Sequence, residues 1–144
     1  MTRSARAPIH LWIVGILAAL WNGFGSLDFL MSASGNEGWA AQMTAEQRAW
    51  LDAAPMTMWA SWACGVLGGL AGSLLLLARS RHAVAAFIVS LAGLAANTLS
   101  QMMLPERSPH LDSGGAVALH VAIWAIAIAL LVYAWRMRTR GVLR

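Results

Sequence analysis

The sequence contains no lysine and a single cysteine, and only 11% of its 144 residues are charged. The lone Cys64 excludes an internal disulfide, a CxxC redox pair and a metal site built from several cysteines. The scarcity of charge accompanies 59% hydrophobic residues and a mean hydropathy of +0.62. This composition excludes a disordered chain and argues against an ordinary soluble domain. We therefore expect a membrane protein, with one domain over residues 1–144.

Four apolar runs are each about 20 residues long, the length that crosses a hydrocarbon core of roughly 30 Å. They predict spans over residues 9–31, 56–78, 83–104 and 116–135. The turn at 79–82 is too short to join anything but antiparallel neighbours. We predict an all-α membrane protein, an antiparallel up-and-down four-helix transmembrane bundle. The alternative for the first run is a signal peptide cleaved near Gly35, but its apolar core exceeds the usual length of about 7–15 residues.

Residues 32–55 form the longest connection between two spans. The stretch from Thr44 to Gln47 fits a capping box, in which the Thr44 side chain accepts a hydrogen bond from the Gln47 amide. It predicts a short helix from about Ala45 to Ala53. The neighbouring Trp39 and Trp50 favour a position at the membrane interface, where tryptophan is enriched.

The charges are distributed unevenly along the chain. Eight of the ten arginines lie in the leader, in the turn at 79–82 and in the tail, whereas five of the six acids lie in the other two connections. Cytoplasmic loops are rich in basic residues, so we expect both termini in the cytoplasm and these two connections on the outer side. A basic tail is suited to anionic lipid headgroups, and this placement argues against nucleic acid as a partner. The tail arginines are Arg136, Arg138, Arg140 and Arg144.

Asp28 is the only acid inside an apolar run, and a charge at membrane depth is a candidate functional residue. Counting about 1.5 Å per residue places it roughly 5 Å inside the outer end of its span. Other polar side chains gather in the same outer half, and Asp28 is expected to form a charge-assisted hydrogen bond with His120. The alternatives are interhelical hydrogen bonds for the amides and solvation for Asp28. The candidate ligand-binding residues are Asn22, Asp28, Trp59, Trp62, Asn97, Gln101 and His120.

Two overlapping pairs of glycines, each four residues apart, mark the second run. Lipid offers no hydrophobic drive for helix association, so small residues that let backbones approach closely supply the packing. We expect this stripe to form either the spine of the bundle or the seam of a homodimer. Its members are Gly65, Gly68, Gly69 and Gly72.

His10 and His82 lie near the cytoplasmic ends of two spans, and paired histidines can ligate a haem. Neither lies well inside the core, so we interpret both as interface histidines and predict no cofactor. No nucleophile–base arrangement, phosphate loop or zinc spacing is present, so the sequence predicts no catalytic residue and no metal site.

Several short motifs resemble those of a family of small bacterial inner-membrane proteins with four spans. They are Leu20-Trp21-Asn22 with Gly25 and Asp28, Asn36-Glu37, Thr44 with Glu46-Gln47, Pro55 with Trp59, and Trp62-Ala63 with the glycine stripe and Ser73 to Leu77. The resemblance covers about the first two-thirds of the chain. It implies the fold and the inner-membrane location and transfers no catalytic residue. Some members carry a sugar-transporter label, for which no residue here supplies a mechanism.

For function, the sequence predicts a non-enzymatic membrane protein whose polar, outward-facing vestibule binds or passes a small ligand. Four spans are few for a solute pathway, so transport would require a homodimer. Two alternatives remain open. One is a membrane enzyme or redox subunit that uses intramembrane histidines with haem or quinone. The other is a structural partner within a larger membrane complex.

Overall fold

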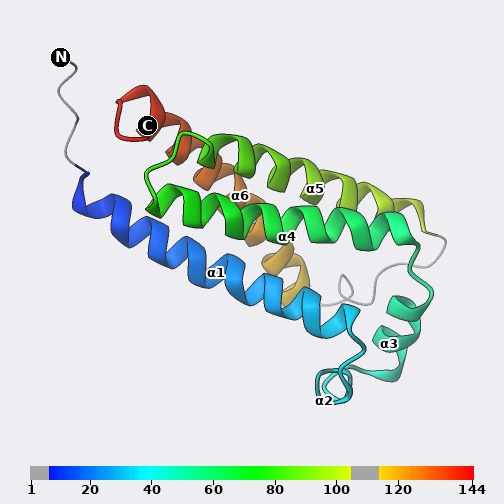
Figure 1. The fold of residues 1–144 in the computed structure, drawn as a ribbon. Helices are drawn as coiled ribbons and strands as arrows, with labels where there is room; N and C mark the ends of the chain where they lie inside the picture. The colour runs from blue at the N-terminus through cyan, green and yellow to red at the C-terminus, as the bar shows by residue number, and fades with distance from the viewer. Residues whose placement is uncertain (1–6, 105–113) are drawn as a thin grey trace.

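Six helices make up the computed structural model, which describes residues 7–104 and 114–144 (Figure 1). Four of them are long and apolar enough to cross a membrane, and no strand occurs within the described ranges. The all-α prediction is therefore confirmed, with boundaries that differ by no more than four residues. The long helices are α1 (Ile9–Ala33), α4 (Met56–Leu77), α5 (Ala83–Met103) and α6 (Gly114–Thr139). The short helices are α2 (Glu37–Ala40) and α3 (Ala45–Asp52).

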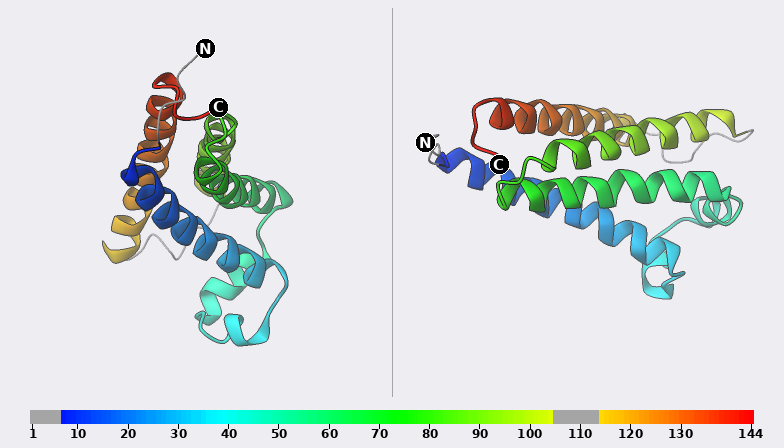
Figure 2. Two further views of the ribbon diagram at one scale, coloured as in Figure 1. Left: turned by 60° about the vertical axis from the view of Figure 1, so that its left-hand side comes forward. Right: turned by 45° about the horizontal axis from the view of Figure 1, so that its top comes forward.

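Helix α4 lies at the centre of the packing, with α1 on one side and α5 on the other (Figure 2). Helix α6 packs mainly against α5, with a smaller contact than the α1–α4 and α4–α5 pairs make. It meets α1 near one end, where the Tyr133 hydroxyl is hydrogen-bonded to His10 Nδ1 and the two rings lie edge to face. The four long helices thus pack in the order α1, α4, α5 and α6. Helices α1 and α6 meet at the contact between His10 and Tyr133.

The glycine stripe of α4 packs against α5 and α1. A Cβ added at Gly68 would lie 3.0 Å from the backbone nitrogen of Ser90, and one added at Gly72 would lie 2.8 Å from the ring of Phe87. A Cβ at Gly69 would overlap the side chain of Asn22 on α1. The stripe is therefore occupied within one chain, as a spine between three helices rather than as a free seam.

The α4–α5 turn and the chain after α6 are hydrogen-bonded to each other. The Arg81 amide donates to the Arg144 carbonyl over 2.7 Å, and the Arg144 amide donates to the Arg79 carbonyl over 2.8 Å. Val142 and Leu143, which lie between the end of α6 and Arg144, are buried in the core. Most of the described arginines are thus collected at the end of the bundle where α1 begins and α6 ends (Figure 1).

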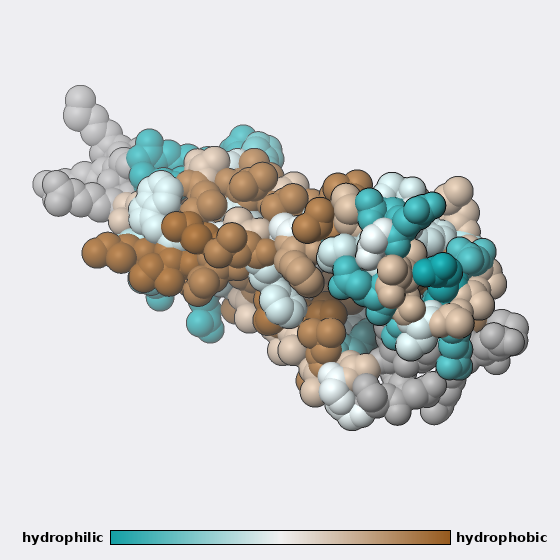
Figure 3. All heavy atoms as spheres, turned by 90° about the horizontal axis from the view of Figure 1, so that it is seen from below, coloured by the Kyte–Doolittle hydropathy of each residue, from teal (hydrophilic) through white to brown (hydrophobic). Residues whose placement is uncertain are grey.

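The opposite end carries α2 and α3 in the connection between α1 and α4 (Figures 1 and 2). Hydrophobic side chains cover the length of the bundle seen in Figure 3, and hydrophilic ones gather where α2 and α3 lie. Five of the charged residues on which the predicted orientation depends lie outside the described residues: Arg3, Arg6, Glu106, Arg107 and Asp112.

The predicted short helix in this connection is confirmed as α3. Both bonds of its capping box are present: the Gln47 amide donates to Thr44 Oγ1 over 3.1 Å, and the Thr44 amide donates to Gln47 Oε1 over 3.0 Å. Helix α2 was not predicted. Its single turn begins after Asn36, whose side-chain oxygen accepts from the Trp39 amide over 3.0 Å.

Candidate functional site

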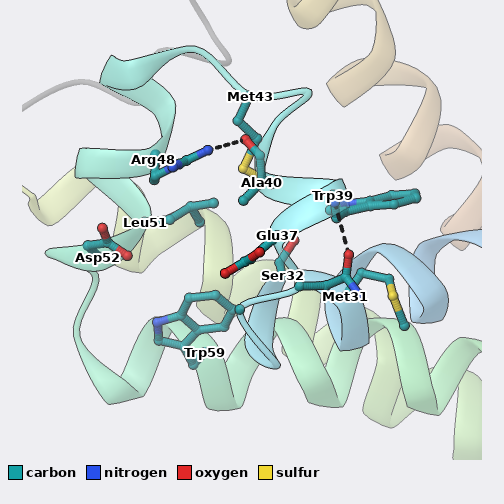
Figure 4. A pocket seen from close by; sticks show the side chains of 12 residues that line it. Met31, Ser32, Glu37, Trp39, Ala40, Met43, Arg48, Leu51, Asp52 and Trp59 are labelled. Carbon is teal, nitrogen blue, oxygen red and sulfur yellow. Dashed lines mark hydrogen bonds between the residues drawn. The ribbon is translucent and has the colours of Figure 1, made fainter.

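A cavity of about 420 Å³ lies between the end of α1, the helices α2 and α3, and the start of α4 (Figure 4). We call it the loop cavity. It combines apolar, polar and charged side chains, as small-molecule sites commonly do. Its lining residues are Met31, Ser32, Gly35, Asn36, Glu37, Trp39, Ala40, Met43, Arg48, Leu51, Asp52 and Trp59.

Local hydrogen bonds hold the two short helices in place around the loop cavity. The caps at Asn36 and Thr44 fix where α2 and α3 begin. The Arg48 guanidinium then donates from Nη2 to the Ala40 carbonyl over 2.7 Å, which ties α3 to the end of α2 (Figure 4). One side of the loop cavity is therefore formed by the connection between α1 and α4, and the caps fix this connection at the starts of α2 and α3.

Trp59, in the first turn of α4, forms the aromatic wall of the loop cavity. Trp62 stacks on it with ring centroids 5.6 Å apart and planes inclined by 28°. Phe29 from α1 contacts both indoles, at centroid distances of 6.2 Å to Trp59 and 5.4 Å to Trp62. These three rings, which we call the aromatic cluster, hold the orientation of the Trp59 ring.

The charged groups of the loop cavity are two carboxylates and one guanidinium, so its walls carry one negative charge in excess. In Figure 4, Glu37 points from α2 towards the ring of Trp59, and Asp52 lies on the α3 side of the same space. Arg48 is directed towards the Ala40 carbonyl. The Arg48 guanidinium keeps its positive charge, so a bound molecule meets two carboxylates and one cation, with one negative charge in excess.

Asp28 lies beside the loop cavity rather than in its lining. Its Oδ1 accepts a hydrogen bond of 2.9 Å from Trp39 Nε1, and the Trp39 ring lines the cavity. The expected hydrogen bond between Asp28 and His120 is not formed: within the described part of the chain, no hydrogen bond or ion pair joins these two residues. Asp28 is satisfied locally, by a residue eleven positions further along the chain.

Asn22 takes part in the seam between α1 and α4. Its Nδ2 donates to Ser73 Oγ over 3.2 Å and to the Ala18 carbonyl over 2.9 Å. Ser26, one turn later, donates to the Val66 carbonyl of α4 over 3.2 Å. The bonds to Ser73 and Val66 are interhelical hydrogen bonds, which was the alternative role considered for Asn22, whereas the bond to Ala18 lies within α1.

Asn97 and Gln101 take part in the seam between α4 and α5. Asn97 Nδ2 donates to the Met58 carbonyl over 3.1 Å, and Gln101 Nε2 donates to Asn97 Oδ1 over 2.6 Å. Deeper in the same seam, Ser90 Oγ donates to the Gly65 carbonyl over 2.6 Å. Asn97 therefore contacts α4 near its start, at Met58, and Asn22 contacts it near its end, at Ser73, so the polar groups are divided between two seams and two depths instead of converging on a single vestibule.

The structure thus brings one predicted site residue, Trp59, into a cavity and stacks a second, Trp62, behind it. The polar residues around them were not proposed as ligand-binding residues from the sequence. Two features of the sequence could have indicated this site: the helix cap at Asn36 and the alternation of acids with tryptophans in residues 32–55. The acids were interpreted only as evidence for topology. The cavity-lining polar residues that the sequence reasoning missed are Ser32, Asn36, Glu37, Trp39, Arg48 and Asp52.

The described residues contain no group of three or more His, Cys, Asp or Glu side chains placed to hold a metal ion. No family model, curated protein or solved structure matches this chain.

Proposed function

We propose that this chain is a multi-pass protein of the bacterial inner membrane that binds a small ligand in the loop cavity, on the outer side, without catalysing a reaction. The observation that carries the proposal is the cavity itself. Its volume of about 420 Å³ falls in the range of small-molecule pockets, and aromatic and charged side chains line it. The resemblance to four-span inner-membrane proteins supports the location.

The charge distribution supports the orientation. The basic α4–α5 turn and the tail are joined at one end of the bundle, and the loop cavity lies at the other end. With the basic end in the cytoplasm, the loop cavity opens towards the periplasm. Anionic lipid headgroups are the proposed partners of the basic end, where Arg136, Arg138 and Arg140 are exposed.

The helix seams favour binding over transport as the role of a single chain. The α4–α5 seam is filled by direct backbone contact at Gly65 and Gly93, and the α1–α4 seam by the side chain of Asn22 against Gly69. A ligand could pass between these helices only if they separated. Binding at the end of the bundle requires no such movement.

A thermal-shift screen of the purified protein against sugars, cations and lipids tests this function. Any molecule that binds only the folded state raises its stability, by about 2.7 kcal/mol at a concentration of 100 Kd. The matched variants are Ala40→Phe, which fills the loop cavity, and Ala41→Phe, which adds the same side chain at an exposed position outside it. A ligand of the loop cavity loses its effect in the first variant only. Equal stabilisation of both variants would place the binding elsewhere.

One observation favours a structural partner as the second candidate. Helix α6 has the least buried of the four apolar segments, and it carries exposed Val121, Ile128 and Trp135. A partner helix packed along α6 would cover these side chains. Co-purification of a stoichiometric second protein, lost when Val121 and Ile128 are replaced by larger residues, would support this role.

A further inference from the structure

We propose that the ligand of the loop cavity is an organic ammonium ion that carries a hydroxyl or carbonyl group, recognised by Trp59 together with Glu37 and Asp52. This inference rests on the proposed function and names the chemical class of its ligand. The same ammonium group is offered by a free small molecule or by the headgroup of a membrane lipid, and the experiment below distinguishes the two sources.

The charge of the walls selects the sign of the ligand. Glu37 and Asp52 are exposed carboxylates on α2 and α3 and face the same space, with no ion pair to Arg48 in the structure as described. The guanidinium of Arg48 is directed to the Ala40 carbonyl instead. With two carboxylates against one guanidinium, the walls carry one negative charge in excess, which favours a cation over an anion.

The aromatic wall selects an organic cation over a bare metal ion. A cation over the face of an indole is attracted by the ring, and quaternary ammonium groups are recognised in this way. Trp62 and Phe29 already fix the Trp59 ring, so little ordering is required on binding. Calcium or magnesium would need about six or more oxygen ligands, but the apolar side chains Met31, Met43 and Leu51 occupy much of this wall.

Ser32 supplies the remaining polar group. Its Oγ is buried and has no hydrogen-bond partner in the described chain, although the residue lines the loop cavity. Buried hydroxyl groups without partners are uncommon in folded proteins. A rotation of the Ser32 side chain into the cavity would let a ligand hydroxyl or carbonyl satisfy this oxygen, so the proposed cation carries such a group beside the ammonium.

Choline and its uncharged isostere 3,3-dimethylbutan-1-ol provide the test, because they share shape and hydroxyl group and differ in charge. Titration calorimetry uses the full chain in nanodiscs of phosphatidylglycerol alone. We expect choline to bind at least about tenfold more tightly than the isostere, and to bind more weakly as salt is raised. Equal affinity for the two molecules would overturn the ammonium assignment while leaving a ligand-binding cavity in place.

Variants of the wall locate the binding. Glu37→Gln and Asp52→Asn should each weaken choline binding by roughly three- to tenfold, and Trp59→Leu by about three- to thirtyfold. Glu46→Gln removes an acid of α3 outside the cavity, and Trp135→Leu removes an exposed indole of α6, so both should retain the wild-type Kd. If Trp59→Leu does not fold, the two carboxylate variants still decide. Wild-type affinity in both of them would reject the proposal.

The lipid composition identifies the source of the ammonium group. If a lipid headgroup is the occupant, adding phosphatidylethanolamine to the nanodiscs should raise the apparent Kd of choline; if the ligand is free, the Kd should not change. Both results support the proposal. If choline fails to bind in either disc while another compound of the thermal-shift screen stabilises the protein through the loop cavity, the ammonium class is wrong and the proposed function stands. If no compound acts through the loop cavity, both are wrong.

Discussion

The carboxylate of Asp28 and the indole nitrogen of Trp39 are joined by a hydrogen bond of 2.9 Å, which fastens α2 to the last turns of α1. Both residues are partly buried, and a hydrogen bond to an ionised acceptor is stronger than one between neutral groups. The bond also orients the Trp39 ring as part of the loop cavity. An acid near the end of a span thus stabilises the structure that lies over it.

Trp39→Phe tests this relationship, because it preserves an aromatic ring and removes the N–H donor. We expect the free energy of unfolding to fall by about 1–3 kcal/mol, since the partly buried carboxylate loses its partner. Amide hydrogen exchange in α2 should also become faster. Trp135→Phe, at an exposed position on α6, is the control and should change neither quantity. The same loss in both variants would show that Asp28 does not depend on this bond.

The backbone contact between α4 and α5 gives a second prediction. A Cβ at Gly93 would lie 2.5 Å from the backbone nitrogen of Gly65, so Gly93→Ala should force the helices apart and lower the free energy of unfolding by about 1–3 kcal/mol. Gly23→Ala is the matched control, because no atom outside its own helix lies within 4 Å of the added Cβ. Gly15 is unsuitable, since its Cβ would overlap the side chain of Leu77. Denaturant titration in detergent measures both variants, and equal stability would exclude a tight seam.

The long helices could be predicted from the sequence because a bilayer leaves an apolar segment of this length few alternatives to a helix. The capping box at Thr44 likewise predicted α3. Helix α2 was missed because its four residues give no periodic pattern and only Asn36 marks its start. The looser packing of α6 was also not predictable, since its apolar residues surround the whole helix and the sequence marks no buried face.

The candidate site was predicted less well because residue counting gives depth and not direction around the helix. Asp28 and Asn97 do lie towards the same end of the bundle, but Asn22 lies near the middle of α1 and its partner Ser73 is near the other end of α4, because the partners are set by which helices touch. Asp28 therefore pairs with Trp39 instead of His120. The cavity itself is formed by side chains of the connection, whose arrangement depends on two short helices and on the Arg48–Ala40 contact.

A double-mutant cycle tests the hydrogen bond between Asn22 and Ser73. We expect Asn22→Ala and Ser73→Ala to show a coupling energy of about 0.6 kcal/mol, because hydrogen bonds between membrane helices are individually weak. The control cycle combines Asn22→Ala with Ser100→Ala, whose hydroxyl donates to the Ala96 carbonyl of its own helix. That coupling should be zero within error. Coupling between Asn22 and Ser100 without coupling between Asn22 and Ser73 would contradict the hydrogen bond observed between α1 and α4.

The separation of Asp28 from His120 gives a fourth prediction. Since no hydrogen bond joins the two side chains, Asp28→Asn and His120→Gln should have additive effects on stability, within about 0.5 kcal/mol. Asp28→Asn combined with Trp39→Phe is the positive control, because those residues are bonded directly and should be coupled. A coupling above about 1 kcal/mol between Asp28 and His120 would restore the charge-assisted pair.

The last prediction concerns orientation and can be measured by labelling of introduced cysteines with a membrane-impermeant reagent. The background is Cys64→Ala, which retains the Cβ that lies against Gly93. Ala41→Cys, at an exposed position after α2, should react from the periplasmic side. Thr139→Cys, exposed at the end of α6, should react only after permeabilisation, because it lies beside the basic turn and tail. The opposite pattern, or a mature N-terminus near Gly35, would contradict the orientation. In the reversed arrangement the loop cavity would face the cytoplasm, and its ligand would have to be a cytoplasmic molecule.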